Sequence, residues 1–299
     1  MIENYGANAT TPTAARADAS PLAAEDITLD AASGWHTQRA SLVLWPSQAF
    51  YLGMGYPTTL HRHHAAQVSI SLGAPLRVRT RASEPYTEQQ SFIVGPNIPH
   101  QADTTGVPCF VLWSEARALV DLARGLSTKS DSPLPALPQD LLNILLPVLL
   151  ASGGKVPDEQ AGQTLASHVL QTLIGPTRVE GDNDPRIATA LLLLTPQFLS
   201  EQTQPIPRLA ALVYLSPSRF RHLFRREMGM SVQSYLRWQR LLVALRTSAR
   251  GASLTEAAHA AGFADSAHLT RVFRATFGAS PSRFFKNSHA VQVIPGAQC

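Results

Sequence analysis

The sequence predicts an α+β protein with two domains, a β-rich N-terminal domain and an all-α C-terminal domain. Three observations predict this class. Short runs rich in β-branched and aromatic residues fill positions 41–113, Leu- and Ala-rich runs follow them, and positions 206–285 contain one helix–turn–helix pattern twice. A chain of 299 residues is long enough to bury two separate cores.

The N-terminal tail and the cysteines indicate the cellular compartment in which the protein acts. Residues 1–24 are rich in Ala, Thr, Ser and Asn, so we expect a disordered tail without the features of a signal peptide. The most apolar run, 141–150, is too short to cross a bilayer. With only Cys109 and Cys299, the chain fits a reducing compartment, and we expect Cys109 to be a buried free thiol. These features predict a cytoplasmic protein with no membrane partner.

Six short runs predict the strands of a small barrel or jelly roll, because Gly and Pro separate them. They are 41–45, 50–52, 67–72, 76–80, 91–94 and 109–113. In one run Val68 and Ile70 alternate with polar residues, which predicts a half-buried strand. In another, Arg77 and Arg79 alternate with apolar residues, so their face is either solvated or lines a polar cavity.

Helices are predicted next, at 115–125, 138–152 and 158–174. The stripe Leu165, Val169 and Leu173 would pack either on the barrel or on a second copy of the chain. Residues 178–183 are short, polar and contain Gly, so we read them as a linker. Asp184 and Pro185 then begin a new helix as N-cap and first helical residue.

The basic residues gather in the C-terminal third. Residues 184–286 hold 14 Lys and Arg against 5 Asp and Glu, a net charge of about +9, whereas the remainder has about −5. This separation predicts a polyanionic partner for one domain only.

Each helix–turn–helix unit ends in a helix with an apolar rear and a polar front. In the first, Ser216 and Pro217 begin a helix whose buried stripe is Phe220, Leu223 and Phe224. In the second, Asp265 caps a helix with a similar apolar stripe, and Gly262 lies in the turn. A helix over 231–250 joins the units. This joining helix would act as a rigid spacer between the second helices of the two units. Those two helices could then enter successive major grooves of double-stranded DNA, which recur about every 34 Å.

The spacing of these residues resembles the AraC/XylS family of bacterial transcription regulators. The pattern runs from Ser216, Phe220 and Phe224 to Ala261-Gly262-Phe263, and on to Phe277-Gly278 with Ser280-Pro281. The resemblance implies a cytoplasmic, effector-responsive regulator, most often an activator that recruits RNA polymerase. By position it implies base contacts from Ser218, Arg221, His222, Ser266, Ala267, His268 and Arg271, and phosphate contacts from Arg225 and Arg274. His222 stands where Arg is common, and Ala267 offers a base only a methyl group.

Histidines mark a second candidate site in the N-terminal domain. The runs Gly55 to Gln67, with His61 and His63, and Pro96 to His100 resemble the two cupin motifs, but Gln67 replaces the carboxylate and the second motif lacks its Gly. A neutral Gln is a poor metal ligand, so an effector pocket or a structural role is favoured over a metal held by His61, His63 and His100. The expected effector site is His61, His63, Gln67, Arg77, Arg79 and His100, and the inward arginines favour an anionic or polyhydroxyl ligand.

The prediction is therefore a cupin-like domain over 25–177 that senses an effector and dimerises, a linker over 178–183, and a DNA-binding domain over 184–290. No catalytic residues and no cofactor are expected. The alternative from another class is a metal-dependent cupin enzyme, an isomerase or dioxygenase, with an appended helical domain.

Overall fold

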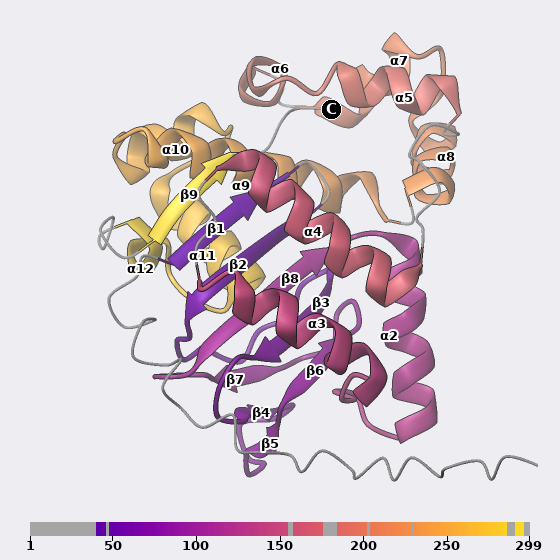
Figure 1. Ribbon diagram of the computed structural model, residues 1–299. Coiled ribbons are helices and arrows are strands. Elements are labelled where there is room, and N and C mark those ends of the chain that lie inside the picture. The colour runs from indigo at the N-terminus through magenta and orange to yellow at the C-terminus, as the bar shows by residue number, and fades with distance from the viewer. Residues whose placement is uncertain are drawn as a thin grey trace, which may run out of the picture.

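The computed structural model describes residues 40–45, 48–154, 158–175, 184–201, 204–228, 230–285 and 291–295. The expected tail (1–24), the expected linker (178–183) and Cys299 lie outside these residues. Strands fill the first part of the chain, and helices fill the rest except for one late strand (Figure 1). The α+β class is thus confirmed. We call residues 40–175 the N-terminal region and residues 184–285 the C-terminal region.

Two sheets lie in the N-terminal region, and their strands are antiparallel except where β9, from the end of the chain, joins the larger sheet. The larger sheet has the order β6-β3-β8-β2-β1-β9, and the smaller has the order β5-β4-β7. The strands are β1 (Ala40–Leu44), β2 (Gln48–Met54), β3 (Ala66–Ser71), β4 (Leu76–Arg79), β5 (Thr87–Gln89), β6 (Ser91–Val94), β7 (Gln101–Asp103), β8 (Pro108–Ser114) and β9 (Val291–Pro295). All six expected strands are present. The sequence patterns missed β5 and β7, which are only three residues long, and β9.

The larger sheet is buried on both faces. On one face, Val68 and Ile70 of β3 pack in a core with three helices of the N-terminal region. On the other, Gln67 and Ser69 are also buried, at 5% and 2% exposure. The expectation of a half-buried β3 is therefore wrong, because its polar residues face the smaller sheet and the histidine-bearing loop rather than water.

Helices α2 (Arg117–Ser130), α3 (Gln139–Ala151) and α4 (Glu159–Ile174) complete the N-terminal region. Figure 1 shows α3 and α4 crossing one face of the larger sheet. Asp158 caps α4 by accepting a hydrogen bond from the backbone N–H of Ala161 (2.9 Å), as expected. Val169 and Leu173 pack in the core beneath α4, and Leu165 lies partly buried at its edge. The apolar stripe is thus used within the chain.

The C-terminal region is entirely helical. Its helices are α5 (Pro185–Leu192), α6 (Pro196–Glu201), α7 (Pro205–Leu212), α8 (Pro217–Met228), α9 (Val232–Ala249), α10 (Leu254–Ala260), α11 (Ser266–Phe277) and α12 (Pro281–Phe285). Asp184 caps α5, as the sequence predicted, and Ser231 caps α9 at the start of the helix expected over 231–250. The short α6 and α12 were not predicted. Among the described residues, no helix is both long and apolar enough to cross a bilayer.

One apolar core runs through both regions. It includes Leu42 and Trp113 of the larger sheet and continues to Phe224, Leu241 and Phe273 of the helices. In addition, β9 follows the last helix and pairs in parallel with β1, so the late strand lies beside the first described strand (Figure 1). The two regions therefore meet over a buried surface.

Candidate nucleic-acid interface

Helix α8 presents one polar face to solvent. The hydroxyl oxygen of Ser216 accepts a hydrogen bond from the backbone N–H of Arg219 (3.3 Å), so Ser216 caps the helix as expected. Phe220, Leu223 and Phe224 are buried. Because these three point inward, the opposite face exposes the four expected contact residues, Ser218, Arg221, His222 and Arg225.

Helix α11 repeats the arrangement. The carboxylate of Asp265 accepts a hydrogen bond from the backbone N–H of His268 (2.6 Å), and Leu269, Phe273 and Phe277 are buried. The expected contacts Ala267, Arg271 and Arg274 are exposed, and Ser266 and His268 are half-buried. The imidazole of His268 packs edge-on against Phe263, with ring centroids 5.3 Å apart, so this side chain is partly held by the fold.

Helix α9 and the tight turn between α10 and α11 set the spacing of these helices. Its 18 residues give a length of about 27 Å at 1.5 Å per residue. Gly262 has φ +72°, and a Cβ there would lie 2.5 Å from the carbonyl oxygen of Leu199. The turn between α10 and α11 therefore requires glycine. In Ser253 and Glu256, α10 also has a full capping box.

The end of α11 is docked on the N-terminal region. The carbonyl oxygen of Gly278 accepts from the backbone N–H of Thr59 (2.9 Å) and from its hydroxyl (3.2 Å). The ring of Phe277 meets Trp113 edge-on, with centroids 5.2 Å apart. From α9, the indole N–H of Trp238 donates to the carbonyl oxygen of Trp45 (3.3 Å).

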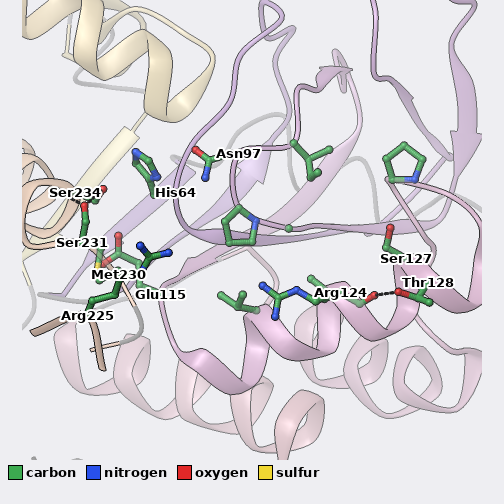
Figure 2. Close-up of a pocket in the computed structure, with 16 residues that line it drawn as sticks. His64, Asn97, Glu115, Arg124, Ser127, Thr128, Arg225, Met230, Ser231 and Ser234 are labelled. Carbon is green, nitrogen blue, oxygen red and sulfur yellow. Dashed lines mark hydrogen bonds between the residues drawn. The ribbon is translucent and has the colours of Figure 1, made fainter. Parts of the chain in front are cut away.

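Some of the expected DNA contacts lie beside the N-terminal region. Arg271 and Arg274 line a groove together with residues 59–62. Arg225 lies at a larger cavity between the two regions (Figure 2). Access to these arginines therefore depends on the placement of the N-terminal region.

The histidines converge as the sequence predicted. One ring nitrogen from each of His61, His63 and His100 lies within 4.8 Å of the others. An isolated bridge pairs His61 with His100, and all three residues are largely buried, with His61 the most exposed at 9%. Gln67 joins them, since its Oε1 lies 2.9 Å from Nε2 of His63 and accepts from the indole N–H of Trp113 (2.8 Å).

Burial holds these imidazoles neutral. It lowers the pKa of His63 to about 4, lowers that of His61, and lowers that of His100 well below the usual range. The Nδ1 atom of each ring lies 2.8–3.0 Å from a backbone carbonyl oxygen. A neutral ring has only one N–H, so His63 can satisfy either Ala65 or Gln67 but not both.

The cluster fits a metal only in part. With Nδ1–H donated to a carbonyl, Nε2 carries the lone pair that a metal requires. His100 Nε2 is buried without a hydrogen-bond partner among the described residues, which favours such a role. Against it, Oε1 of Gln67 is already engaged, and the grouped ligands are three histidines with no carboxylate in the described part of the chain.

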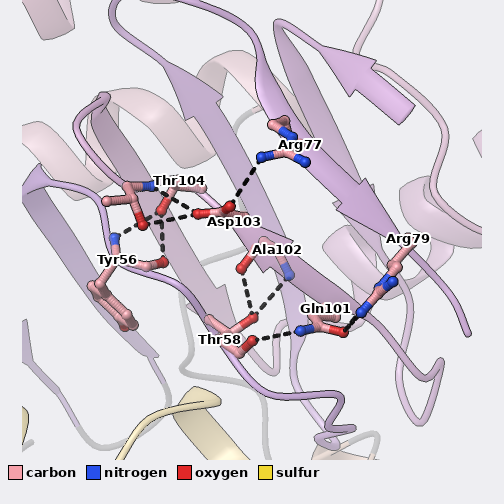
Figure 3. Close-up of polar contacts among 9 residues, drawn as sticks. Tyr56, Thr58, Arg77, Arg79, Gln101, Ala102, Asp103 and Thr104 are labelled. Carbon is pink, nitrogen blue, oxygen red and sulfur yellow. Dashed lines mark hydrogen bonds and ion pairs between the residues drawn. The ribbon is translucent and has the colours of Figure 1, made fainter. Parts of the chain in front are cut away.

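The two arginines do not join the histidines, so the expectation of inward arginines is wrong. Arg77 is exposed and pairs with Asp103 (3.2 Å), and Arg79 donates to Oε1 of Gln101 (Figure 3). Both guanidinium groups also lie over the ring of Tyr86. The alternation along β4 turns its apolar residues into the core, and this leaves the arginines on the outer face.

This outer polar layer secures the loop that carries His61. Gln101 donates to the carbonyl oxygen of Thr58 (3.1 Å), and Thr58 exchanges hydrogen bonds with the backbone of Ala102 (Figure 3). Thr104 binds both backbone groups of Tyr56. The hydrogen bonds on the outer face of the smaller sheet thus hold the loop in place.

The sequence reading missed the residues at the junction of the two regions. Arg237 donates to Nε2 of His64 (3.1 Å), and Glu115 lies nearby with its Oε2 buried and unpaired among the described residues. Burial raises the pKa of Glu115 to about 8. The only sequence feature that could have pointed to Glu115 is its position, as a single acidic residue between a buried strand and a helix.

Comparison with known proteins assigns the C-terminal region to a domain family. Residues 209–287 match a family described as a helix-turn-helix domain. The arabinose operon regulatory protein of Escherichia coli (strain K12) is 39% identical over 87 residues, which cover 29% of this chain and 30% of that protein. The probable transcriptional regulator LumQ of Photobacterium leiognathi is 26% identical over 122 residues, 40% of this chain and 49% of that protein.

An alignment with a solved structure extends over more of the chain. ToxT from Vibrio cholerae O395 aligns with 83% of this chain and 96% of its own, at 10% identity and a TM-score of 0.45. The sequence match to the arabinose regulators spans only about a third of their length.

The C-terminal region is a helix-turn-helix domain, as its two capped and matched helices indicate. The match to the arabinose operon regulatory protein confirms, over these residues, the resemblance to the AraC/XylS regulators seen in the sequence.

Proposed function

We propose that the chain is a sequence-specific DNA-binding transcription regulator, an activator by preference, that responds to a small-molecule effector. The observation that carries the proposal is the pair of helices α8 and α11, each with a buried aromatic rear and an exposed cationic front, joined by α9. The net charge of about +9 over residues 184–286 supports a polyanionic partner. The match to the arabinose operon regulatory protein supports the regulatory role.

Each expected contact residue on α8 and α11 has a proposed role. Bases are contacted by Ser218, Arg221, His222, Ser266, Ala267, His268 and Arg271, and phosphates by Arg225 and Arg274. Arginine is suited to the bidentate contact with guanine, whereas the methyl group of Ala267 suits the methyl group of thymine. His268 makes its contact from a ring already oriented by Phe263.

The partners and boundaries belong to the same proposal. The N-terminal domain spans 25–177 and is cupin-like, and the DNA-binding domain spans 184–290. The protein acts in the cytoplasm as a homodimer and contacts RNA polymerase. Because the α4 stripe is buried within the chain, the dimer uses a different surface.

A gel shift across a salt series tests the proposal, with DNA from upstream of the protein's own gene. Neutralising phosphates releases counterions, so log K should fall linearly with log salt, by about 0.9 for each phosphate contacted. Unrelated DNA of equal length is the control and should bind more weakly at every salt concentration. Equal binding to both fragments, or binding that ignores salt, would contradict a sequence-specific regulator.

A metal-dependent enzyme is the second candidate, because the three imidazoles of His61, His63 and His100 meet in one buried cluster. It requires a stoichiometric metal held through Nε2, at about 2.0–2.1 Å for zinc. Metal analysis of protein purified without chelators discriminates, with His63→Ala as the control. A stoichiometric metal that this variant loses would favour the enzyme, and a substoichiometric content in both proteins would remove it.

A further inference from the structure

Tyr214 lies in the tight turn between α7 and α8 (Figure 1), and it is 96% exposed. Its neighbours turn inward, since Val213 is buried and Leu215 packs against the core. Among the described residues, the side chain of Tyr214 has no hydrogen-bond partner and no ring contact. The fold therefore makes no use of this large aromatic side chain.

The backbone of Tyr214 adopts a conformation that is unfavourable for a bulky residue. Its φ is +57°, in the left-handed region, where a Cβ comes close to the carbonyl oxygen that follows it. Two hydrogen bonds fix the turn: the N–H of Tyr214 donates to the carbonyl oxygen of Ala211 (3.1 Å), and that of Leu215 donates to Ala210 (2.8 Å). Residues held in this way gather at functional positions.

The second helix–turn–helix unit shows what such a turn requires. There the N–H of Phe263 donates to the carbonyl oxygen of Ala258 (2.9 Å), five residues back, as Leu215 does to Ala210. This bond aligns Tyr214 with Gly262, whose φ is +72°. Glycine adopts the left-handed region without steric cost, so it would satisfy the turn in the first unit as well. The tyrosine is therefore not there to make the turn.

The surroundings of Tyr214 are cationic and lie next to the proposed DNA surface. Residues 202–226 contain five arginines and no Asp or Glu, and all five arginines are exposed. Tyr214 also comes two residues before Ser216, which caps α8. In a helix–turn–helix, the start of the second helix contacts base edges while the first helix crosses the backbone. The turn between them therefore lies where the groove meets the backbone.

We propose that Tyr214 is a further DNA-contacting residue, which packs its ring on a deoxyribose and donates its hydroxyl to a phosphate oxygen beside the bases that α8 reads. The inference rests on the proposed function, since it adds a contact to that DNA surface. Contacts to sugar and phosphate, from tyrosine among other residues, fix the register of a protein on the duplex without reading its sequence. A tyrosine ring is rigid, so ordering it at an interface costs little entropy.

Gel shifts of Tyr214→Phe and Tyr214→Gly with the upstream DNA fragment test the contact. Tyr214→Phe should weaken binding at least about fivefold, because it loses a hydrogen bond to a charged oxygen. Tyr214→Gly also loses the ring and should weaken binding further, about tenfold or more. Unchanged affinity in both variants would overturn the proposal and leave the ring to a protein partner.

Stability distinguishes a DNA contact from a role in folding. Tyr214→Gly should leave the midpoint of urea unfolding equal or higher, because glycine relieves the unfavourable conformation at φ +57°. Weaker DNA binding without a loss of stability is the expected combination. A lower midpoint would show that the ring supports the turn, and would overturn the proposal.

Salt and sequence dependence identify the kind of contact. The loss of affinity should be uniform across single-base variants of the fragment, since phosphates carry no sequence information. The slope of log K against log salt should not change, because a neutral hydroxyl releases no counterion. A loss confined to one base pair, or a reduced slope, would overturn the backbone contact.

Leu192→Ala is the matched control, since Leu192 is a 70% exposed apolar residue at the end of α5 in the same region. It should change neither affinity nor salt slope, and an effect equal to that of Tyr214→Gly would overturn the assignment. The wild-type chain separates the two levels of inference. If it binds DNA and the Tyr214 variants bind equally well, only this contact is wrong. If it binds no DNA under any condition, the proposed function itself fails.

Discussion

The carbonyl oxygen of Gly278 accepts two hydrogen bonds from Thr59, one from its backbone N–H (2.9 Å) and one from its hydroxyl (3.2 Å). These residues are 219 positions apart in the chain. Gly278 ends helix α11, and Thr59 lies two residues before the first histidine of the buried cluster. The pair therefore ties the placement of α11 to the N-terminal region.

Gly278→Ala should destabilise the protein by about 2–4 kcal/mol, as measured by urea unfolding. Gly278 has φ +70°, which costs a residue with a Cβ about 1–2 kcal/mol, and that Cβ would lie 2.6 Å from both Thr58 and His61. Gly251→Ala is the control, since φ there is +94° and nothing lies within 4 Å. If the two variants are equally stable, the docked contact does not hold in solution.

Trp113→Phe should cost about 1 kcal/mol more than Trp45→Phe in the same measurement. Both substitutions shrink a buried indole, but only Trp113 donates its N–H to Gln67, whereas the N–H of Trp45 has no partner among the described residues. The difference between the variants thus reports the hydrogen bond. A larger loss for Trp45→Phe would argue against the Gln67 network.

Glu115→Gln should flatten the dependence of stability on pH. The folded-state pKa of Glu115, about 8, is above its ordinary 4.5, so the folded state holds an extra proton between these values. The wild-type free energy of unfolding therefore falls as pH rises through this window, by at most about 1.4 kcal/mol per pH unit.

Urea unfolding of both proteins between about pH 5 and pH 8 measures this effect, and the difference between them isolates Glu115 from the histidines. Parallel curves would show that Glu115 is ionised in the folded protein.

Arg221→Ala and Arg271→Ala should each cost about 1–3 kcal/mol in DNA binding and relax the preference for one base pair. Arg225→Ala and Arg274→Ala should instead weaken all sequences alike and reduce the salt slope by about 1 each. Binding to single-base variants of the upstream DNA fragment, measured by gel shift across a salt series, gives both quantities. Arg81→Ala, at a side chain that is 79% exposed on the N-terminal region, is the control and should change neither.

The sequence predicted the C-terminal region well because its signals are local. Caps such as Ser216 and Asp265, and apolar spacing such as Phe220 to Phe224, act within one or two turns of helix. The same holds for Asp158 at the start of α4. The convergence of the histidines was also predicted, from the two cupin-like motifs that carry His61, His63 and His100.

The junction of the two regions was not predictable, because it depends on pairs that are far apart in the chain. Nothing near Thr59 indicates that Gly278 will meet it, and nothing near Glu115 indicates a cavity shared with Arg225. The arginines of β4 were placed on the wrong side because alternation gives two faces but does not say which one is interior.

The parallel pairing of β9 with β1 has a practical consequence for dissecting the molecule. The backbone of residues 291–295 completes the border of a sheet whose other strands come from the opposite end of the chain. Cutting the polypeptide between its two regions would leave β1 with an unpaired edge and β9 without the strand with which it pairs. Uncovered strand borders recruit other chains, so separately expressed halves should self-associate unless they are mixed and reassemble.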